Sequence, residues 1–213
     1  MKKIITACIV AFGLITTSAS AQTDAKAKGI LDAVSKKAAT LKSLKANFTL
    51  KLSGGKTKET RTGSFLMKGQ KYHVTLPKQE LISDGKTVWT YMKDGNEVQV
   101  SNFNPSEQSM SPTKLFTNFY DKEFKYRYAG ARTVAGKPCD IIELTPIKAG
   151  TQFVKVELAI DKNSTIAGGN MYEKNGNTYA YEVSGYTPNA PVTDAQFVFD
   201  AKAHKGVEVV DLR

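Results

Sequence analysis

Residues 47–52 read Asn-Phe-Thr-Leu-Lys-Leu, a strict alternation of polar and apolar side chains. Successive side chains of a β-strand point to opposite faces, so this period of two predicts a strand with one buried and one solvated face. The same alternation recurs at 65–67, 72–76 and 124–128. The pattern therefore indicates a half-buried antiparallel sheet.

Turn residues separate the predicted strands. Dipeptides and tripeptides that supply the positive φ of tight hairpins occur at Gly54-Gly55, Asp84-Gly85, Asp94-Gly95-Asn96, Ala135-Gly136 and Asn175-Gly176. Their spacing predicts a long meander in which each strand pairs with the next. Because no internal repeat or Pro-rich linker interrupts this pattern, we expect a single domain over residues 22–213.

Two segments carry a helical pattern instead. From Asp24 to Leu44 the apolar residues recur at steps of three and four, which is typical of an amphipathic helix. In 111–120, Ser111 is a suitable cap and Pro112 a suitable first helical residue. The sequence thus predicts an α+β fold, mainly antiparallel β, with two or three helices over one sheet.

The first 21 residues have the organisation of a secretory signal peptide. A basic head, Met1-Lys2-Lys3, precedes a mostly apolar stretch over 4–17 and the small residues Ala19-Ser20-Ala21. The apolar stretch is too short to cross a membrane as a helix. We therefore expect cleavage before Gln22 and a soluble, exported protein. Cys139 is then the single thiol, and we expect it to be a small packing residue on a strand.

The net charge of +10, from 30 Lys and Arg against 20 Asp and Glu, falls to +8 when Lys2 and Lys3 leave with residues 1–21. Only four of the basic residues are arginines, and the lysines are scattered, so a nucleic-acid interface is not expected. The surplus suits brief contact with anionic membrane surfaces or acidic partners. It is equally explained by solubility.

Catalytic and metal-binding groups are scarce. The histidines, His73 and His204, form no Cys/His pair or zinc pattern with Cys139. The Gly-Lys-Thr triplets at 55–57 and 85–87 lack the earlier glycine of a phosphate loop. We therefore expect no enzyme activity, no catalytic residues, no metal and no cofactor. The many large apolar residues instead favour an apolar cavity between the sheet and its helices, although a simple core would also use them.

Several stretches carry a family resemblance. Residues 81–91, Leu-Ile-Ser-Asp-Gly-Lys-Thr-Val-Trp-Thr-Tyr, resemble a hairpin and strand of the outer-membrane lipoprotein carrier protein (LolA) family. Residues 63–68 and 111–116 resemble its Gly-x-hydrophobic strand and its middle helix, and 194–199 followed by 206–209 resemble its closing strands. The resemblance covers nearly all of 22–213.

The resemblance implies an unclosed, incomplete β-barrel of about eleven strands covered by two or three helices. It also implies a monomeric periplasmic chaperone that receives the acyl chains of lipoproteins from an inner-membrane transporter and delivers them to an outer-membrane receptor. Transient contact with a membrane surface is expected. The acyl-binding residues that we expect are Phe48, Leu50, Phe65, Met67, Tyr72, Trp89, Leu115, Phe116 and Phe119.

One departure keeps alternatives open. Members of the family commonly carry Arg-Pro after the Gly-x-hydrophobic strand, and the arginine holds the helical lid, whereas here Lys68 is followed by Gly69-Gln70-Lys71. A carrier of another lipid or a glycolipid with the same fold is therefore the first alternative. A secreted carbohydrate-binding domain or enzyme is the second.

Overall fold

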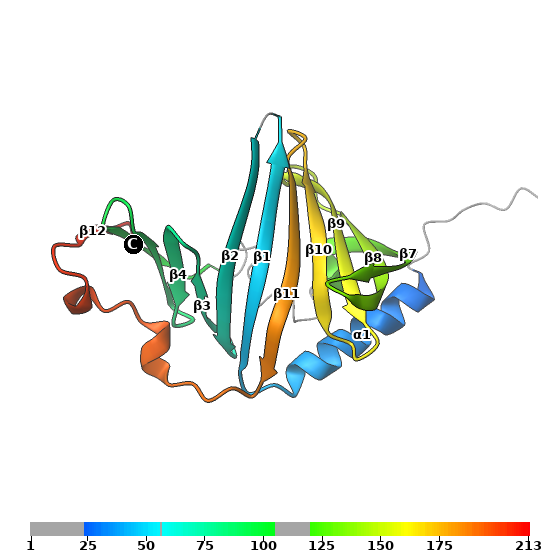
Figure 1. The fold of residues 1–213 in the computed structure, drawn as a ribbon, viewed down its shortest axis with the longest axis horizontal. Helices are drawn as coiled ribbons and strands as arrows, with labels where there is room; N and C mark the ends of the chain where they lie inside the picture. Colours follow the sequence, from blue (N-terminus) through cyan, green and yellow to red (C-terminus); the bar gives the residue numbers. More distant parts are fainter. Residues whose placement is uncertain (1–23, 56, 105–119) are drawn as a thin grey trace, which may run out of the picture.

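The computed structural model of the chain describes residues 24–55, 57–104 and 120–213. Within them, one sheet contains twelve strands in the order β12-β6-β5-β4-β3-β2-β1-β11-β10-β9-β8-β7. Figure 1 shows a strongly curved sheet whose end strands, β12 and β7, lie at opposite sides of the molecule. The sheet is therefore unclosed, as expected, with twelve strands where about eleven were predicted.

The strands have the following bounds: β1 Leu44–Gly54, β2 Thr57–Lys68, β3 Lys71–Thr75, β4 Gln79–Ser83, β5 Thr87–Met92, β6 Glu97–Asn102, β7 Phe124–Val134, β8 Lys137–Pro146, β9 Phe153–Asp161, β10 Ile166–Glu173, β11 Thr178–Pro188 and β12 Glu208–Asp211.

The sheet consists of two antiparallel meanders, β1 to β6 and β7 to β11, joined where β1 pairs with β11. The predicted meander is thus confirmed within each half. Strand β12 departs from it, because it returns across the molecule and pairs with β6 in a parallel register. The long strands β1, β2 and β11 form the middle of the sheet (Figure 1).

Helix α1 spans Ala25–Ala39 and packs on the end of the sheet formed by β7 to β10 (Figure 1). Its first turn is capped by Asp24, whose carboxylate accepts hydrogen bonds from the backbone N–H groups of Lys26 and Ala27. The buried side of the helix is formed by Ala27, Leu31 and Val34. They pack against the main apolar cluster of the fold, which includes Tyr126, Ile142, Leu144, Val156, Leu158 and Ile160.

The predicted end of this helix at Leu44 is wrong, because α1 ends at Ala39 and Leu44 begins β1. The chain leaves the helix to bond with the segment after β11: Lys42 N–H donates to Asn189 Oδ1 at 2.8 Å, and the Ser43 hydroxyl donates to the Ala190 carbonyl at 2.5 Å. Leu41 and Leu44 match the apolar spacing of the helix, but they lie after it and pack into a second cluster with Phe65 and Tyr72.

The hairpin turns agree with their sequence signals. Positive φ occurs at Gly55, Gly85, Asn96 and Gly176, all within the predicted turns. In the β7–β8 turn both central residues are left-handed, Ala135 at φ 49° and Gly136 at φ 74°. Two successive positive φ values are the requirement of a tight two-residue hairpin, so the register of β7 on β8 follows from this turn.

The C-terminal segment differs from expectation. Residues 194–199 do not form a closing strand: Asp194–Phe197 is a 3₁₀ turn, η2, and Ala201–Ala203 is another, η3. A capping box explains this, because Thr193 N–H donates to the Gln196 side chain at 2.8 Å and favours the helical turn. Only the second half of the prediction, around 206–209, contains strand residues, in β12.

Two predictions lie outside the described residues. The signal peptide over 1–21 is one, and most of the helix predicted over 112–120, with Leu115, Phe116 and Phe119, is the other. Its last residue, Tyr120, begins the short helix α2, Tyr120–Glu123. No helix within the described ranges is long and apolar enough to cross a membrane.

Candidate functional site

One face of the sheet carries a continuous set of apolar side chains, and we call it the inner face. Directly opposed residues of paired strands point to the same side of a sheet. The pairs Leu50–Tyr181, Phe65–Val74 and Met67–Tyr72 therefore share a face. It is also the face on which α1 packs, because Tyr181 contacts the α1 cluster. Its apolar members include Phe48, Leu50, Leu52, Phe65, Met67, Tyr72, Val74, Leu81, Met171, Tyr179, Tyr181 and Val183.

Five of the predicted acyl-binding residues lie together on this inner face. Phe65, Met67 and Tyr72 are buried with Leu44 in one cluster, and Tyr72 exposes only 1% of its surface. Phe48 packs against the same cluster but, like Leu50, is only half-buried. The inner face therefore combines a buried base on β2 and β3 with partly exposed apolar side chains on β1.

Trp89 lies on the opposite face. Trp89 pairs with Ile82, Ile82 pairs with His73, and His73 pairs with Leu66, so all four side chains share one face. Leu66 points away from its neighbour Met67, so this face is not the inner one. Trp89 packs there in a third cluster with Tyr91 and Phe199, under the C-terminal segment. The structure thus separates Trp89 from the other five residues, and we leave it out of the candidate site.

Strand β11 contributes residues that the sequence argument missed. Tyr179, Tyr181 and Val183 face the same side as Leu52, Leu50 and Phe48, their respective partners on β1. Tyr179, Tyr181 and Val183 alternate with a period of two along β11, and the predicted strands do not include this pattern. That alternation is the signal that could have identified β11 as a strand with an apolar face, although it does not identify β1 as its neighbour.

A pocket of about 500 Å³ opens where β2 extends beyond its partner β3. Phe48 and Gly63 form part of its wall, with Ser64, Thr75 and Leu76. The missing side chain at Gly63 makes room for the Phe48 ring, because a Cβ there would lie 2.6 Å from Phe48 Cζ. Its other lining residues, which include Asn47, Thr49, Thr62 and Ser184, point away from the inner face, as Ser64 and Thr75 do, so the pocket belongs mainly to the opposite side of the sheet.

The inner face has a polar boundary on β2. Arg61 stands opposite Leu50, and Glu59 stands opposite Leu52. The two side chains pair with each other through two bonds of 2.7 Å, Arg61 donating from Nε and Nη2. This ion pair marks the point at which the apolar surface of the central strands meets charged groups.

A polar contact joins the two helices. The Tyr120 hydroxyl on α2 donates to Asp32 on α1 at 2.7 Å, and Lys28 bridges Asp32 and Asp121 at 3.0 and 3.6 Å. Burial and the adjacent Asp32 carboxylate raise the pKa of Tyr120 to about 12, so it remains a neutral donor. The start of α2 is thus fixed to α1.

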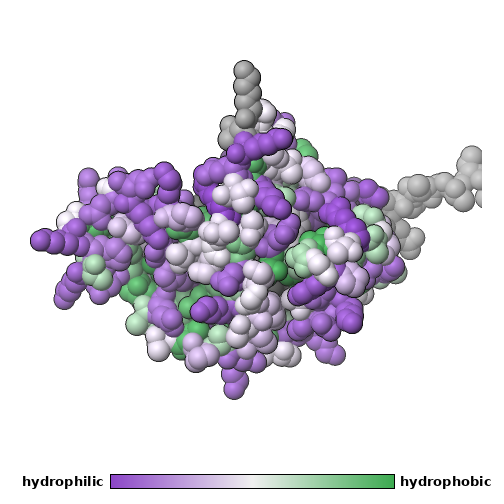
Figure 2. All heavy atoms as spheres, in the orientation of Figure 1, coloured by the Kyte–Doolittle hydropathy of each residue, from purple (hydrophilic) through white to green (hydrophobic). Residues whose placement is uncertain are grey.

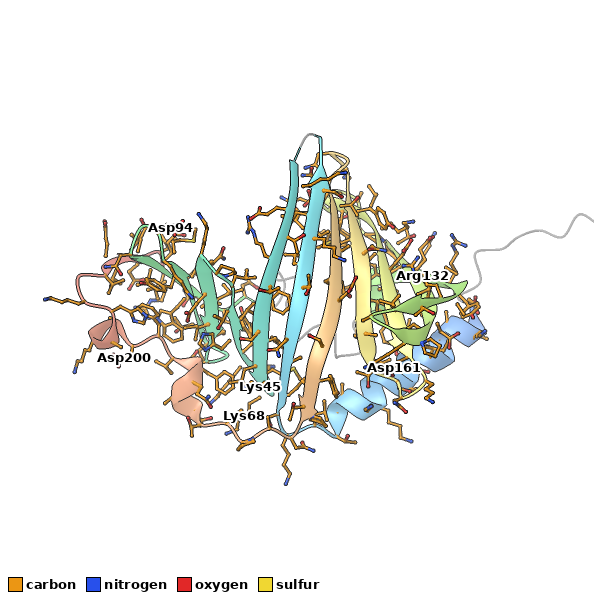
Figure 3. The ribbon with its side chains drawn as sticks, in the orientation of Figure 1. Lys45, Lys68, Asp94, Arg132, Asp161 and Asp200 are labelled. Atoms are coloured by element: carbon orange, nitrogen blue, oxygen red, sulfur yellow. The ribbon has the colours of Figure 1, made fainter. Side chains whose placement is uncertain are left out.

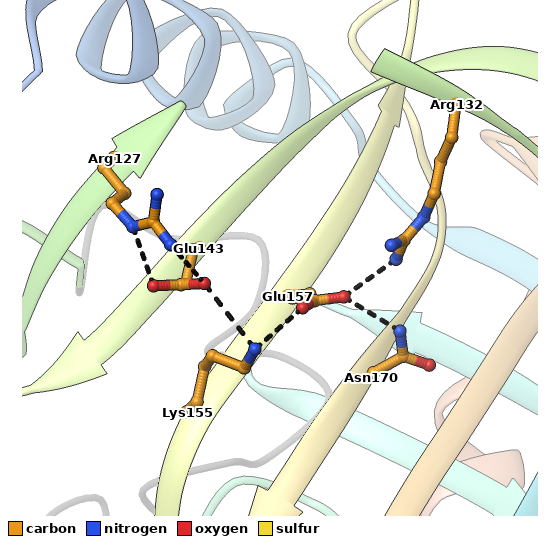
Figure 4. Close-up of polar contacts among 6 residues, drawn as sticks. All are labelled: Arg127, Arg132, Glu143, Lys155, Glu157 and Asn170. Atoms are coloured by element: carbon orange, nitrogen blue, oxygen red, sulfur yellow. Dashed lines mark hydrogen bonds and ion pairs between the residues drawn. The ribbon is translucent and has the colours of Figure 1, made fainter. Parts of the chain in front are cut away.

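The opposite, outer face carries a charged network along β7 to β10, beside a small buried apolar cluster that includes Cys139, Ile141 and Ala159. Figure 4 shows two carboxylates, Glu143 and Glu157, among Arg127, Arg132 and Lys155. Burial opposes ionisation of Glu157, but hydrogen bonds from Asn170, Arg132 and Lys155 outweigh it and lower the pKa of this carboxyl to about 2. Figure 2, in the orientation of Figure 1, shows a mainly hydrophilic surface with small hydrophobic patches.

The C-terminal segment is fastened at the position where the sequence departs from the family pattern. Lys68 and Lys71 both pair with Asp194 of η2, at 2.9 and 3.2 Å, and Figure 3 shows Lys68 beside this segment. His73 contacts the Gln196 carbonyl and Glu80. Lys68 and Lys71, which lie near the position of the family arginine, thus hold the C-terminal segment on the outer face of the sheet. Phe65 and Tyr72 point to the other face.

Comparison with known proteins gives one consistent family. Residues 39–200 match the family model described as outer membrane lipoprotein carrier protein LolA. The outer-membrane lipoprotein carrier protein of Haemophilus influenzae is 27% identical over 176 residues, covering 80% of this chain and 81% of the relative. That of Yersinia enterocolitica is 26% identical over 219 residues and covers the whole of both chains.

A solved structure supports the fold. An uncharacterized conserved protein from Thermus thermophilus has a TM-score of 0.59 to this chain at 16% identity, covering 87% of this chain and 99% of the other. At this identity the similarity concerns the fold alone.

Proposed function

The chain belongs to the outer membrane lipoprotein carrier protein LolA family, and we propose that it carries lipoproteins by binding their acyl chains on the inner face of the sheet. The observation that carries the proposal is the clustering of Phe48, Leu50, Phe65, Met67 and Tyr72 on one face of an unclosed sheet. A closed apolar core would leave no such partly exposed residues on β1.

The energetics explain why a carrier needs this surface. Each buried methylene contributes about 0.8 kcal/mol, so an acyl chain of roughly fifteen such groups resists entering water by on the order of 12 kcal/mol. Half-buried Phe48 and Leu50 offer apolar area that a chain can cover while the cluster of Phe65, Met67 and Tyr72 stays buried. The carrier acts without catalysis, since transfer requires only that the next site bind the acyl chains more tightly.

The cellular setting is part of the same proposal. Cleavage of residues 1–21 places residues 22–213 in the periplasm as one carrier domain. There it receives lipoproteins from a releasing transporter of the inner membrane and passes them to a receptor on the outer membrane. The name of the relatives, outer-membrane lipoprotein carrier protein, supports this direction of transfer.

The test is capture from membranes. Purified 22–213 is incubated with energised inner-membrane vesicles that contain newly made lipoproteins, and the supernatant is analysed by mass spectrometry. The proposal predicts a 1:1 complex of the protein with acylated lipoprotein, and an L50K variant that captures much less. Bound phospholipid or glycolipid without lipoprotein would contradict the proposal.

That contrary result would favour a second candidate, a carrier of another lipid with the same fold. The observation behind it is the replacement of the family's Arg-Pro by Gly69-Gln70, together with the use of Lys68 and Lys71 to hold Asp194. These lysines bind the C-terminal segment on the outer face and do not replace the arginine, so the inner face lacks the family's contact to its cover, which would fit a different cargo.

A further inference from the structure

The hydroxyl group of Tyr181 is buried and has no hydrogen-bond partner among the residues that the structure describes. Buried polar groups in native proteins are nearly always paired, so an unpaired one calls for an explanation. Burial raises the pKa of Tyr181, which keeps the phenol protonated and therefore able to donate. The group is a hydrogen-bond donor held in an apolar environment.

The other tyrosines at this end of the inner face behave differently. The hydroxyls of Tyr120, Tyr126 and Tyr128 donate to the carboxylates of Asp32, Asp121 and Asp140 at 2.7, 2.8 and 2.8 Å. Each of these phenols thus has a charged acceptor from the protein itself. Tyr181 packs against the same α1 cluster but is the one whose buried oxygen lacks such an acceptor in the described ranges.

The backbone is shaped to hold the Tyr181 ring in place. Tyr181 stands opposite Gly169 on β10 and Leu50 on β1. A Cβ on Gly169 would lie 2.7 Å from the Tyr181 hydroxyl oxygen and 2.9 Å from Cζ, so the ring lies across the glycine. The donor is therefore fixed on the inner face, two residues from Val183 and Tyr179 along β11 and directly beside Leu50.

We propose that the Tyr181 hydroxyl is a ligand-positioning group that donates a hydrogen bond to an ester carbonyl oxygen of the bound acyl chains. The inference rests on the proposed function and deepens it. An ester carbonyl accepts hydrogen bonds but cannot donate, so it complements a phenol that lacks an acceptor. It is also the polar group that enters the site with each esterified acyl chain. Tyr181 would thereby set how deeply the chains slide over Leu50.

The test compares two ligands and two variants. The ligands are a synthetic diacylglyceryl lipopeptide and its dialkyl ether analogue, which has the same chains and no ester carbonyl. The variants are Tyr181→Phe, which removes the unpaired hydroxyl, and Tyr128→Phe, which removes a hydroxyl paired with Asp140. Affinities are measured by calorimetry, and the Tm of each ligand-free variant is measured by circular dichroism.

We expect Y181F to weaken binding of the diacylglyceryl lipopeptide by about three- to tenfold and to leave binding of the ether analogue unchanged. The Tm of ligand-free Y181F should equal or exceed that of the wild type, whereas Y128F should lower the Tm and change neither affinity.

Three results would overturn the inference: equal lipopeptide affinity of wild type and Y181F, an equal loss for both ligands, or a lowered Tm for ligand-free Y181F. Failure of the wild type to bind either ligand would instead refute the proposed function itself.

Discussion

The ring of Phe48 on β1 lies over Gly63 on β2, in the space that a side chain at position 63 would need. A Cβ there would be 2.6 Å from Phe48 Cζ and also 2.6 Å from the Thr75 carbonyl oxygen, which belongs to the backbone and cannot rotate away. The position of an inner-face aromatic side chain thus depends on a glycine on the neighbouring strand.

We therefore predict that Gly63→Ala displaces the Phe48 ring and destabilises the protein by about 1–3 kcal/mol, the usual cost of overpacking. Urea denaturation measures this change, and lipopeptide binding should weaken at the same time because Phe48 moves. The matched control is Gly29→Ala in α1, where an added Cβ meets no atom within 4 Å. That variant should be more stable by about 0.5–1 kcal/mol. Equal effects of the two substitutions would contradict the packing argument.

The C-terminal segment gives a second prediction, because two kinds of contact hold it. Phe197 is completely buried, whereas Asp194 pairs with Lys68 and Lys71 in the open. We expect Phe197→Ala to cost about 3–5 kcal/mol, in the range of large-to-small core substitutions. Asp194→Asn should cost less than about 1 kcal/mol, as is usual for exposed ion pairs. Denaturation curves compare the two variants, and a larger loss for D194N would show that the ion pairs dominate.

The pH dependence of stability provides a third prediction. The pKa of Glu157 is lowered to about 2 in the folded protein, from 4.5 for the free side chain. The folded state therefore binds this proton less readily than the unfolded state, so the stabilisation is complete above about pH 4.5 and is lost as the pH falls toward 2. We expect Glu157→Gln to flatten the fall in unfolding free energy across this window. An identical pH profile for wild type and E157Q would rule out this role.

Much of the fold could be predicted because its signals are local. The alternation at 47–52 and the turn at Ala135-Gly136 depend only on nearby residues, and both are present in the structure as predicted. Errors occurred where distant contacts decide the outcome. Leu41 and Leu44 continue the helical spacing, yet hydrogen bonds of Lys42 and Ser43 to residues 189–190 end the helix before them.

The inner face was harder to predict for the same reason. The residues on β1 to β3 belong to one meander, so their shared face follows from local alternation. The alternation around Trp89 correctly predicts strand β5. Which face of β5 belongs to the inner face, however, depends on the pairings from β2 through β3 and β4 to β5. Tyr181 reaches Leu50 only through the pairing of β1 with β11, which are 131 positions apart at this point and carry no local signal of contact.

The central claim is that acyl chains occupy the inner face, and adjacent residues of β1 allow a direct test. Leu50 points inward and Thr49 points outward, so a photoreactive benzoylphenylalanine at either position samples one face from almost the same place. After capture of lipoprotein from inner-membrane vesicles, irradiation should crosslink the acylated lipoprotein at position 50 and not at position 49. Equal crosslinking at both positions, or crosslinking at position 49 alone, would contradict the account.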